Sequence, residues 1–263
     1  MKSISYALKE IAEIGKKERK KTVFLIGNTT KVETSDFYLT PVRNYGQVVL
    51  SGVIVYSEKI AKKIAIEVDG LVDYVFVDAE KKISDNNSIS GEPGNIERAV
   101  KEVIKKSIFI SYKSNDLTVD AADAFISEFY SSDLVGIGGR KVSIIGAGNI
   151  GSKLAQKLVE RGANVYLFRR DREKLDLIVK QINMIKSEFT IAKAFSATSI
   201  KEACLGSDIL IGASDGLPVI DELIIDFLPD HSLLIDIGKG SISSEAIKIA
   251  GLRKLEISRL SIE

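Results

Sequence analysis

The chain has 263 residues, 45% of them hydrophobic, and its 37 basic and 36 acidic residues leave a formal net charge of +1. This balance offers no electrostatic basis for binding nucleic acid or an anionic membrane, and no apolar run approaches the ~18 residues of a membrane-spanning helix. The single cysteine, Cys204, cannot form a disulfide within the chain, and no Cys/His cluster predicts a metal site. We therefore expect a cytoplasmic protein without a bound metal, long enough for two modest domains.

Apolar periodicity predicts a small α/β domain over residues 1–132, which we interpret as the substrate-binding and catalytic domain. It carries no glycine-rich phosphate-binding fingerprint. Turn residues between 81 and 95 predict an exposed loop. The predicted helices cover 3–20, 57–67, 95–106 and 116–130, and the predicted strands cover 22–26, 47–55, 73–77 and 107–112.

A glycine-rich segment, Val135-Gly136-Ile137-Gly138-Gly139, separates the two halves of the chain. No strand precedes it and a strand follows it, so it lacks the strand–turn–helix context of a phosphate loop. We interpret it as a hinge between the first domain, 1–132, and a second domain, 133–263. Two α/β lobes on a hinge predict a cleft, with the carboxyl ends of the strands facing it.

Strands and helices alternate regularly through the second half. Such alternation predicts a parallel, doubly wound sheet, the Rossmann architecture. The predicted strands cover 141–145, 164–168, 189–194, 208–212, 232–237 and 252–257, and the predicted helices cover 149–161, 171–184, 198–204, 219–227 and 243–250.

The most informative segment is the glycine turn that follows the first of these strands. It reads Gly146-Ala147-Gly148-Asn149-Ile150-Gly151 and leads directly into an amphipathic helix. Gly146 allows a tight turn, Gly148 allows the backbone to approach a pyrophosphate, and Gly151 allows the helix to pack closely on the strand. The free N–H groups and the positive dipole end of the helix face the phosphates. Together with the strand, helix and second strand, this turn predicts a dinucleotide-binding site.

The end of the second strand indicates which dinucleotide binds. NAD-specific units carry an acidic residue there to accept from the ribose 2′-hydroxyl. This chain carries Arg169 and Arg170 instead, and a guanidinium group matches the charge and geometry of a 2′-phosphate. Asp171 is more simply the N-cap of the next helix, and Arg170 has the alternative of a solvated loop residue. The sequence favours NADP over NAD as the cofactor.

Two further loops follow strands of the same sheet and are expected to border the nicotinamide. The first contains Ala213, Ser214 and Gly216, and the second contains Gly238. Glycine at these positions allows the backbone to approach the ring. Asp215 in the first loop and Lys239 in the second are possible substrate contacts, but both residue types are also common in turns without such a role.

Candidate catalytic residues gather where the predicted strand 107–112 ends. Lys113, beside Asp116, is a candidate general acid or base, and Tyr112 is a second possible proton donor. The alternative is that Lys113 is solvated and that Asp116 caps the following helix. Among the acidic residues that flank the strand 73–77, Asp78 is the one expected to face the cleft.

These features together resemble the superfamily of shikimate dehydrogenase and methylene-tetrahydrofolate dehydrogenase, which pairs a small α/β domain with a C-terminal NAD(P)-binding Rossmann domain. The resemblance in architecture covers nearly the whole chain. Phe168-Arg169-Arg170-Asp171 resembles the NADP motif of shikimate dehydrogenases, and Phe109 to Lys113 resembles the segment that carries their catalytic lysine. Ser207 to Ala213 and Leu234 to Gly238 resemble strands of the folate enzymes. Ser114 to Ala122 is similar to the interdomain helix of methylene-tetrahydromethanopterin dehydrogenases.

We therefore predict an NADP-dependent dehydrogenase or reductase that acts on a small polar metabolite in the cleft, with Lys113 assisting proton transfer. One alternative is a dehydrogenase of the methylene-tetrahydrofolate or methanopterin type, whose pterin would need a slot formed by Phe37, Tyr38 and Tyr45. Another is a non-catalytic sensor or partner protein that binds NADP only as a ligand. The resemblance also implies a possible homodimer.

Overall fold

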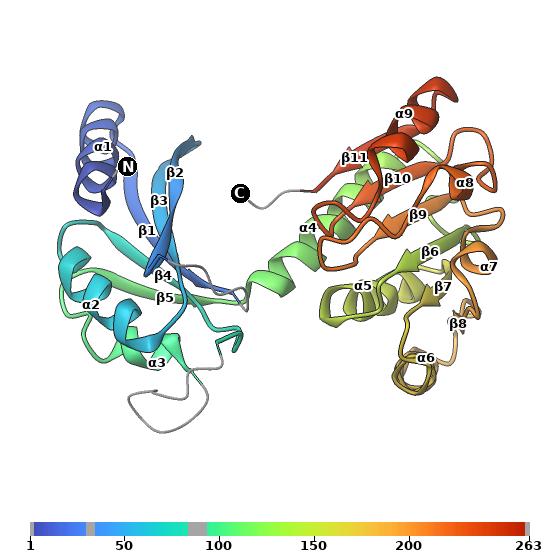
Figure 1. The fold of residues 1–263 in the computed structure, drawn as a ribbon, viewed down its shortest axis with the longest axis horizontal. Coiled ribbons are helices and arrows are strands. Elements are labelled where there is room, and N and C mark those ends of the chain that lie inside the picture. Colours follow the sequence, from blue (N-terminus) through green and yellow to red (C-terminus); the bar gives the residue numbers. More distant parts are fainter. Residues whose placement is uncertain (1–2, 30–34, 84–93, 261–263) are drawn as a thin grey trace. The chain divides into compact units, whose positions relative to one another are not determined.

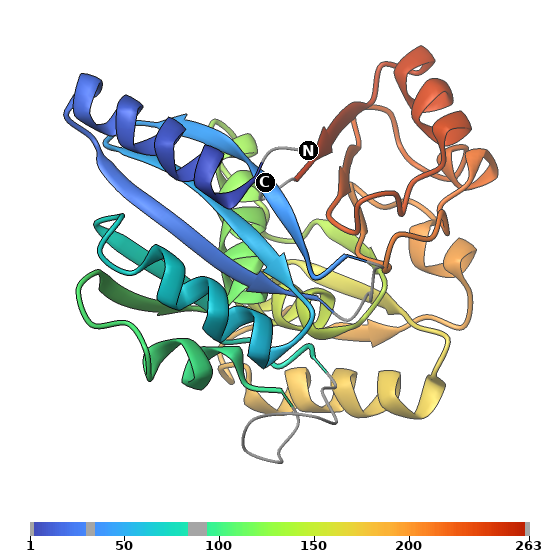
Figure 2. The same cartoon turned by 60° about the vertical axis from the view of Figure 1, so that its left-hand side comes forward.

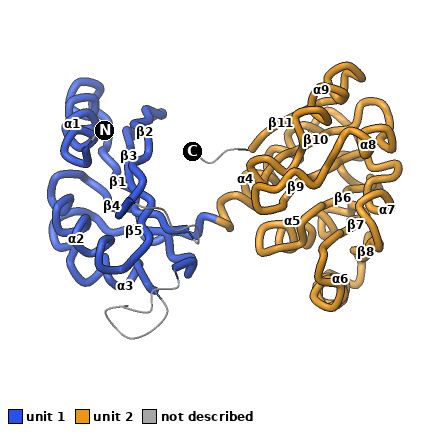
Figure 3. The backbone as a smooth tube through the Cα atoms, viewed as in Figure 1, with its two compact units in different colours: residues 1–114 blue, residues 115–263 orange. Residues whose placement is uncertain are grey.

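The computed structural model describes residues 3–29, 35–83 and 94–260. The chain divides into two compact units, Met1–Ser114 and Asn115–Glu263 (Figure 3). Each unit contains its own sheet and its own hydrophobic core. Most of the loop expected between 81 and 95 lies outside the described residues.

The first unit is built on a five-stranded sheet in the order β2-β3-β1-β4-β5. Strands β3, β1, β4 and β5 run parallel, and β2 is an edge strand that pairs with β3 in the antiparallel sense. Helices α1, α2 and α3 lie on one face of this sheet (Figure 1; Figure 2). The elements are α1 (Ile4–Glu18), β1 (Lys21–Asn28), β2 (Phe37–Tyr45), β3 (Val48–Val55), α2 (Glu58–Val68), β4 (Tyr74–Asp78), α3 (Ile96–Lys101) and β5 (Ile108–Tyr112).

Local sequence explains where α1 begins and which face it buries. The Ser3 hydroxyl accepts a hydrogen bond from the Tyr6 N–H, which satisfies one of the free donors at the start of the helix. Ile4, Leu8 and Ile11 recur at helical spacing and are buried in the core of the first unit. The predicted helix over 3–20 is therefore present in the structure.

Strand β2 is absent from the sequence-based prediction. Pro41 lies in its middle, and the ladder to β3 shifts register between Thr40 and Arg43. A proline without an N–H donor is tolerated in an edge strand or at a bulge, but it also obscures the strand pattern in the sequence. Only the pairing with β3 makes this segment a strand.

The aromatic residues of β2 do not share one face. Phe37 packs against the core of the first unit, whereas the side chain of Tyr38 is 52% exposed. Adjacent residues of a strand point to opposite faces of the sheet. The slot predicted from Phe37, Tyr38 and Tyr45 for a pterin ring is therefore not formed by these three side chains together.

Helix α4 (Ser114–Phe129) closely matches the predicted helix over 116–130, but its packing assigns it to the second unit. Val119, Ala122 and Ile126 are buried in the hydrophobic core that covers the second sheet. Arg161 also donates to both carboxylate oxygens of Asp123, at 2.6 and 2.8 Å. The chain therefore divides between Ser114 and Asn115 rather than near residue 132.

We expect Ile126→Ala to lower the free energy of unfolding by about 2–5 kcal/mol, because the removed atoms are fully buried and leave a cavity. Urea denaturation of the full chain, followed by circular dichroism, measures this change. Leu117→Ala, on the same helix but 47% exposed, is the matched control and should change stability by about 0.5 kcal/mol or less. Equal losses in the two variants would contradict the packing described for α4.

The second unit contains a fully parallel six-stranded sheet in the order β11-β10-β9-β6-β7-β8. Read from β8, with β6 counted as the first strand, this order is 3-2-1-4-5-6, which confirms the predicted doubly wound Rossmann architecture. The elements after α4 are β6 (Lys141–Ile145), α5 (Asn149–Glu160), β7 (Asn164–Phe168), α6 (Arg172–Ile185), β8 (Ala194–Ser196), α7 (Ile200–Cys204), β9 (Ile209–Gly212), α8 (Glu222–Ile225), β10 (Leu233–Asp236), α9 (Ser244–Leu252) and β11 (Glu256–Arg259).

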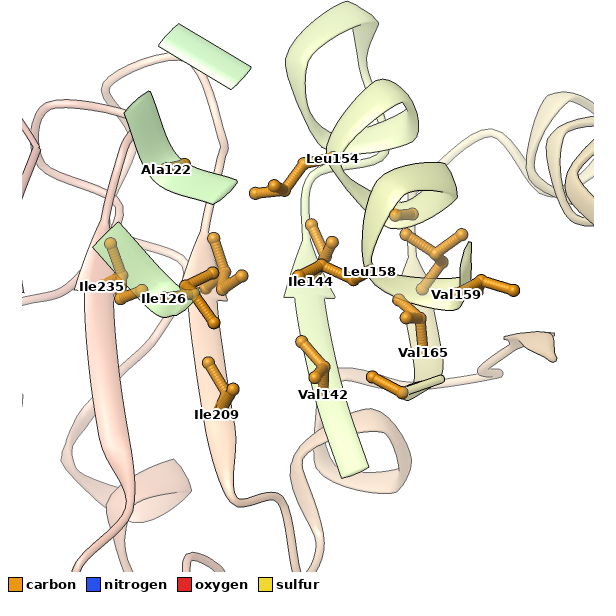
Figure 4. Packing of buried hydrophobic residues seen from close by; sticks show 14 of the residues in the cluster. Ala122, Ile126, Val142, Ile144, Leu154, Leu158, Val159, Val165, Ile209 and Ile235 are labelled. Carbon is orange, nitrogen blue, oxygen red and sulfur yellow. The ribbon is translucent and has the colours of Figure 1, made fainter. Parts of the chain in front are cut away.

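Alternate residues of β6, β9 and β10 supply two separate cores, one on each face of the second sheet. Ile144 and Ile209 pack with Leu154 and Leu158 of α5 and with Ile126 of α4 (Figure 4). On the opposite face, the core contains residues from β6, β9 and β10 together with residues of α7, α8 and α9. Burial on both faces explains why these strands are continuous apolar runs in the sequence.

Strand β8 begins later than predicted. The predicted range 189–194 includes Phe189 and Ile191, but these side chains are 87% and 92% exposed. Only Ala194–Ser196 pairs with β7, as a short edge strand. Within the ranges described, no helix combines the length and the apolar character needed to cross a membrane.

Candidate functional site

The glycine turn between β6 and α5 adopts the conformation that its sequence predicts. Gly146 has a φ of +114°, which side-chain-bearing residues rarely adopt, and a Cβ there would lie 2.6 Å from the Ala213 carbonyl. A Cβ on Gly151 would lie 2.2 Å from the Gly146 carbonyl oxygen. A Cβ on Gly148, by contrast, would meet no atom within 4 Å, so its backbone is open to a ligand.

Helix α5 presents its first turn without a side-chain cap. Gly148 is the N-cap residue and has no side chain that could accept from the N–H groups at the start of the helix, which begins with Asn149 and Ile150. Helix α6, in contrast, is capped by the Asp171 carboxylate, which accepts from the Lys174 N–H at 3.1 Å. An uncapped helix start beside an open glycine turn fits the phosphates of a dinucleotide.

Arg169 lies against this turn, because β7 is the immediate neighbour of β6 in the sheet. The two strands pair through Ile145 and Phe168, and the Arg169 Nη1 donates to the Ala147 carbonyl oxygen at 2.7 Å. This bond uses one of the five N–H donors of the guanidinium group. Arg170 is exposed, and Asp171 caps α6, as the sequence predicts.

Two loops at the carboxyl ends of β9 and β10 lie beside the glycine turn. Ala213 is in contact with the turn, because its carbonyl lies 2.6 Å from where a Cβ on Gly146 would be. Ser214 follows Ala213 in the loop. The Gly216 N–H donates to the Gly238 carbonyl at 3.0 Å, which joins the two loops. The structure thus brings Ala213, Ser214 and Gly238 together with the glycine turn at one edge of the sheet.

The predicted catalytic residues are not brought together in the same way. Lys113 is exposed, and it forms no hydrogen bond or ion pair with another residue in the described parts of the chain. Asp116 lies in the second unit and pairs with Lys153 of α5. Burial, followed by the nearby charge of Asp78, raises the pKa of the Tyr112 hydroxyl, so this group stays protonated at neutral pH.

A polar cluster that the sequence analysis did not assemble lies at the carboxyl ends of β1, β4 and β5. Asp78 ends β4, is 2% exposed, and accepts from Lys82 Nζ at 3.0 Å and from the Ser114 hydroxyl at 3.0 Å. Lys82 Nζ also donates to the Ser114 hydroxyl at 2.7 Å. Asn28, at the end of β1, accepts from the Lys82 backbone N–H at 3.1 Å.

This cluster holds an ammonium group beside a buried carboxylate. Lys82 Nζ lies 3.0 Å from the Asp78 carboxylate, and the Lys82 side chain remains 25% exposed. Two of its three N–H donors bind Asp78 and Ser114, which leaves one directed elsewhere. The spacing of Asp78 and Lys82 was visible in the sequence, but their contact with Ser114 depends on the pairing of β4 with β5.

The fold and the glycine turn define the second unit as a Rossmann domain. Residues 141–240 match the family described as NADP oxidoreductase, coenzyme F420-dependent. A glutamyl-tRNA reductase of Pyrobaculum aerophilum is 26% identical over 140 residues, which are 52% of this chain and 33% of that protein. The glutamyl-tRNA reductase 2 of Pyrobaculum arsenaticum is also 26% identical and is covered over 32% of its length. The chain therefore matches about a third of the length of these curated relatives.

Two solved structures share the fold over most of the chain. The L-tryptophan dehydrogenase of Nostoc punctiforme has a TM-score of 0.52 at 12% identity, over 91% of this chain and 70% of that one. The hetero-hexameric glutamate dehydrogenase of Thermus thermophilus has a TM-score of 0.53 at 11% identity, over 92% of this chain and 64% of that one. At these identities the similarities show a shared fold, and they do not single out the shikimate dehydrogenases that the motifs resemble.

Proposed function

We propose that the protein is an NADP-dependent oxidoreductase that transfers a hydride to or from a small polar metabolite. The observation that carries the proposal is the position of Arg169 against the glycine turn, where it donates to the Ala147 carbonyl. At this position a guanidinium group with further free donor capacity can bind a ribose 2′-phosphate. Asp171, the acidic residue nearest in sequence, caps α6 instead.

The roles of the residues follow from their positions. Gly148, Asn149 and Ile150 bind the pyrophosphate through backbone N–H groups, and Arg169 binds the 2′-phosphate. The bound nicotinamide supplies or accepts the hydride. Lys82, oriented by Asp78 and Ser114, donates a hydrogen bond to the substrate oxygen and moves the proton that accompanies hydride transfer. This role replaces the one predicted for Lys113.

The role proposed for Lys82 requires a substrate with an oxygen atom that can accept a hydrogen bond from its Nζ. A ketone, aldehyde or alcohol group on a small polar molecule meets this requirement, because its oxygen is the atom that gains or loses a proton.

Titration of the full chain with NADPH and with NADH, followed by nicotinamide fluorescence, tests the proposal. We expect NADPH to bind at least about tenfold more tightly, since a charge-assisted hydrogen bond to phosphate contributes about 1.5–3 kcal/mol. Adenosine 2′,5′-bisphosphate should displace NADPH. Equal affinities for the two cofactors would overturn the NADP assignment, and binding of neither would overturn the oxidoreductase function.

A further inference from the structure

The loop after β10 donates backbone hydrogen bonds to a buried carboxylate. Asp236, the last residue of β10, is 6% exposed. Its two oxygens accept the backbone N–H groups of Gly240 at 2.7 Å and of Ser241 at 3.2 Å. A carboxylate that accepts two backbone N–H groups fixes the path of a turn more firmly than a neutral acceptor does.

Ser241 connects this loop by hydrogen bonds to the loop after β9. Its side chain is fully buried, and its hydroxyl accepts from the Ser214 N–H and donates to the Ser214 carbonyl, both at 3.1 Å. One hydroxyl thus binds both backbone polar groups of Ser214. Asp236, Ser241 and Ser214 form a continuous hydrogen-bonded chain, which we call the β10 latch.

The backbone inside the β10 latch has no spare room and adopts constrained conformations. A Cβ on Gly238 would lie 2.0 Å from both the Ser214 carbonyl oxygen and the Ser241 hydroxyl. Lys239 and Gly240 follow with φ values of +57° and +119°. Lysine rarely adopts this left-handed conformation, so the surrounding hydrogen bonds must impose it.

We infer that Asp236 and Ser241 are positioning residues, which preorganise the loops after β9 and β10 to receive the nicotinamide riboside half of the cofactor. The inference rests on the proposed function. A dinucleotide lies across the point where the strand order reverses, here between β6 and β9. Arg169 lies on the β7 side of this point and takes the adenosine half, so the β10 latch lies on the side of the nicotinamide half.

The test compares Asp236→Ala and Ser241→Ala with the unmodified chain in their affinities for NADPH and for adenosine 2′,5′-bisphosphate, which lacks the nicotinamide half. We expect Asp236→Ala to weaken NADPH about tenfold and Ser241→Ala about threefold, because the loops lose their hydrogen bonds. The affinity for the bisphosphate should change by less than about twofold in both. The fluorescence enhancement of bound NADPH, which reports on the ring itself, should fall in parallel.

Asp208→Ala is the matched control. Asp208 also accepts a backbone N–H, that of Lys141 at 2.8 Å, but it lies next to the amino end of β9 on the opposite edge of the sheet. It should leave both affinities unchanged. Equal weakening of both ligands by Asp236→Ala and Ser241→Ala, or no weakening of NADPH, would overturn the positioning role alone. Failure of the unmodified chain to bind either ligand would overturn the proposed function together with it.

Discussion

Replacing Arg169 with alanine is expected to weaken NADPH binding by roughly ten- to a hundredfold while leaving NADH binding nearly unchanged. The loss corresponds to about 1.5–3 kcal/mol, the contribution of hydrogen bonds to a charged group. The selectivity for NADPH follows because only this cofactor carries the 2′-phosphate that the guanidinium binds. Isothermal titration calorimetry of the variant with both cofactors measures the effect.

Arg170→Ala is the control for this measurement. Arg170 is adjacent in sequence and equally charged, but its side chain is exposed, and Arg169 is the residue that donates to the glycine turn. The two variants therefore change the net charge equally and differ in geometry. A larger loss of NADPH affinity in Arg170→Ala would assign the 2′-phosphate to Arg170, and equal losses of NADPH and NADH in Arg169→Ala would exclude phosphate recognition by Arg169.

Replacing Lys82 with methionine is expected to lower kcat by about 10²–10⁴-fold, the usual contribution of a positioned proton-transfer group. Methionine keeps the length and the apolar stem of the side chain but cannot donate a proton. NADPH affinity should not change, because the proposed cofactor contacts are made by the glycine turn and Arg169 and do not include Lys82. The rate is measured by NADPH absorbance with a carbonyl or hydroxyl compound identified by screening.

Two further variants separate a catalytic from a structural effect. Lys113→Met removes an exposed lysine near the end of the same sheet and should change kcat by less than about threefold, since exposed side chains without partners contribute little. The double variant Asp78→Asn, Lys82→Met removes the buried charge that Lys82→Met leaves unpaired and should recover stability but not activity. Recovery of activity in the double variant, or a larger loss in Lys113→Met, would contradict the assignment to Lys82.

The second unit could be predicted closely because its signals are local in sequence. Gly146, Gly148 and Gly151 lie within six residues. Gly146 and Gly151 meet steric requirements of the turn, and Gly148 leaves its backbone open to a ligand. The strands of this sheet are buried on both faces, so they appear as short apolar runs whose alternation with helices predicts the parallel order. Asp171 as a helix cap depends only on the residue three positions later.

The features that the sequence did not reveal depend on contacts between distant segments. Helix α4 has the same periodicity whichever core it packs on, and the burial of Ile126 among residues of the second unit decides where the chain divides. Strand β2 is interrupted by Pro41 and exists only through its pairing with β3.

The same reason applies to the candidate site. Lys113 and Lys82 both follow apolar strands. The residues next to them in the sequence do not indicate which of the two lysines belongs to the candidate site. Parallel pairing of β4 with β5 brings Ser114 to Asp78, 36 positions away in the chain, and thereby orients Lys82. Ser241 likewise reaches Ser214, 27 positions away, through the pairing of β9 with β10. Local spacing therefore determined the class of cofactor site, and strand pairing decided which side chains surround it.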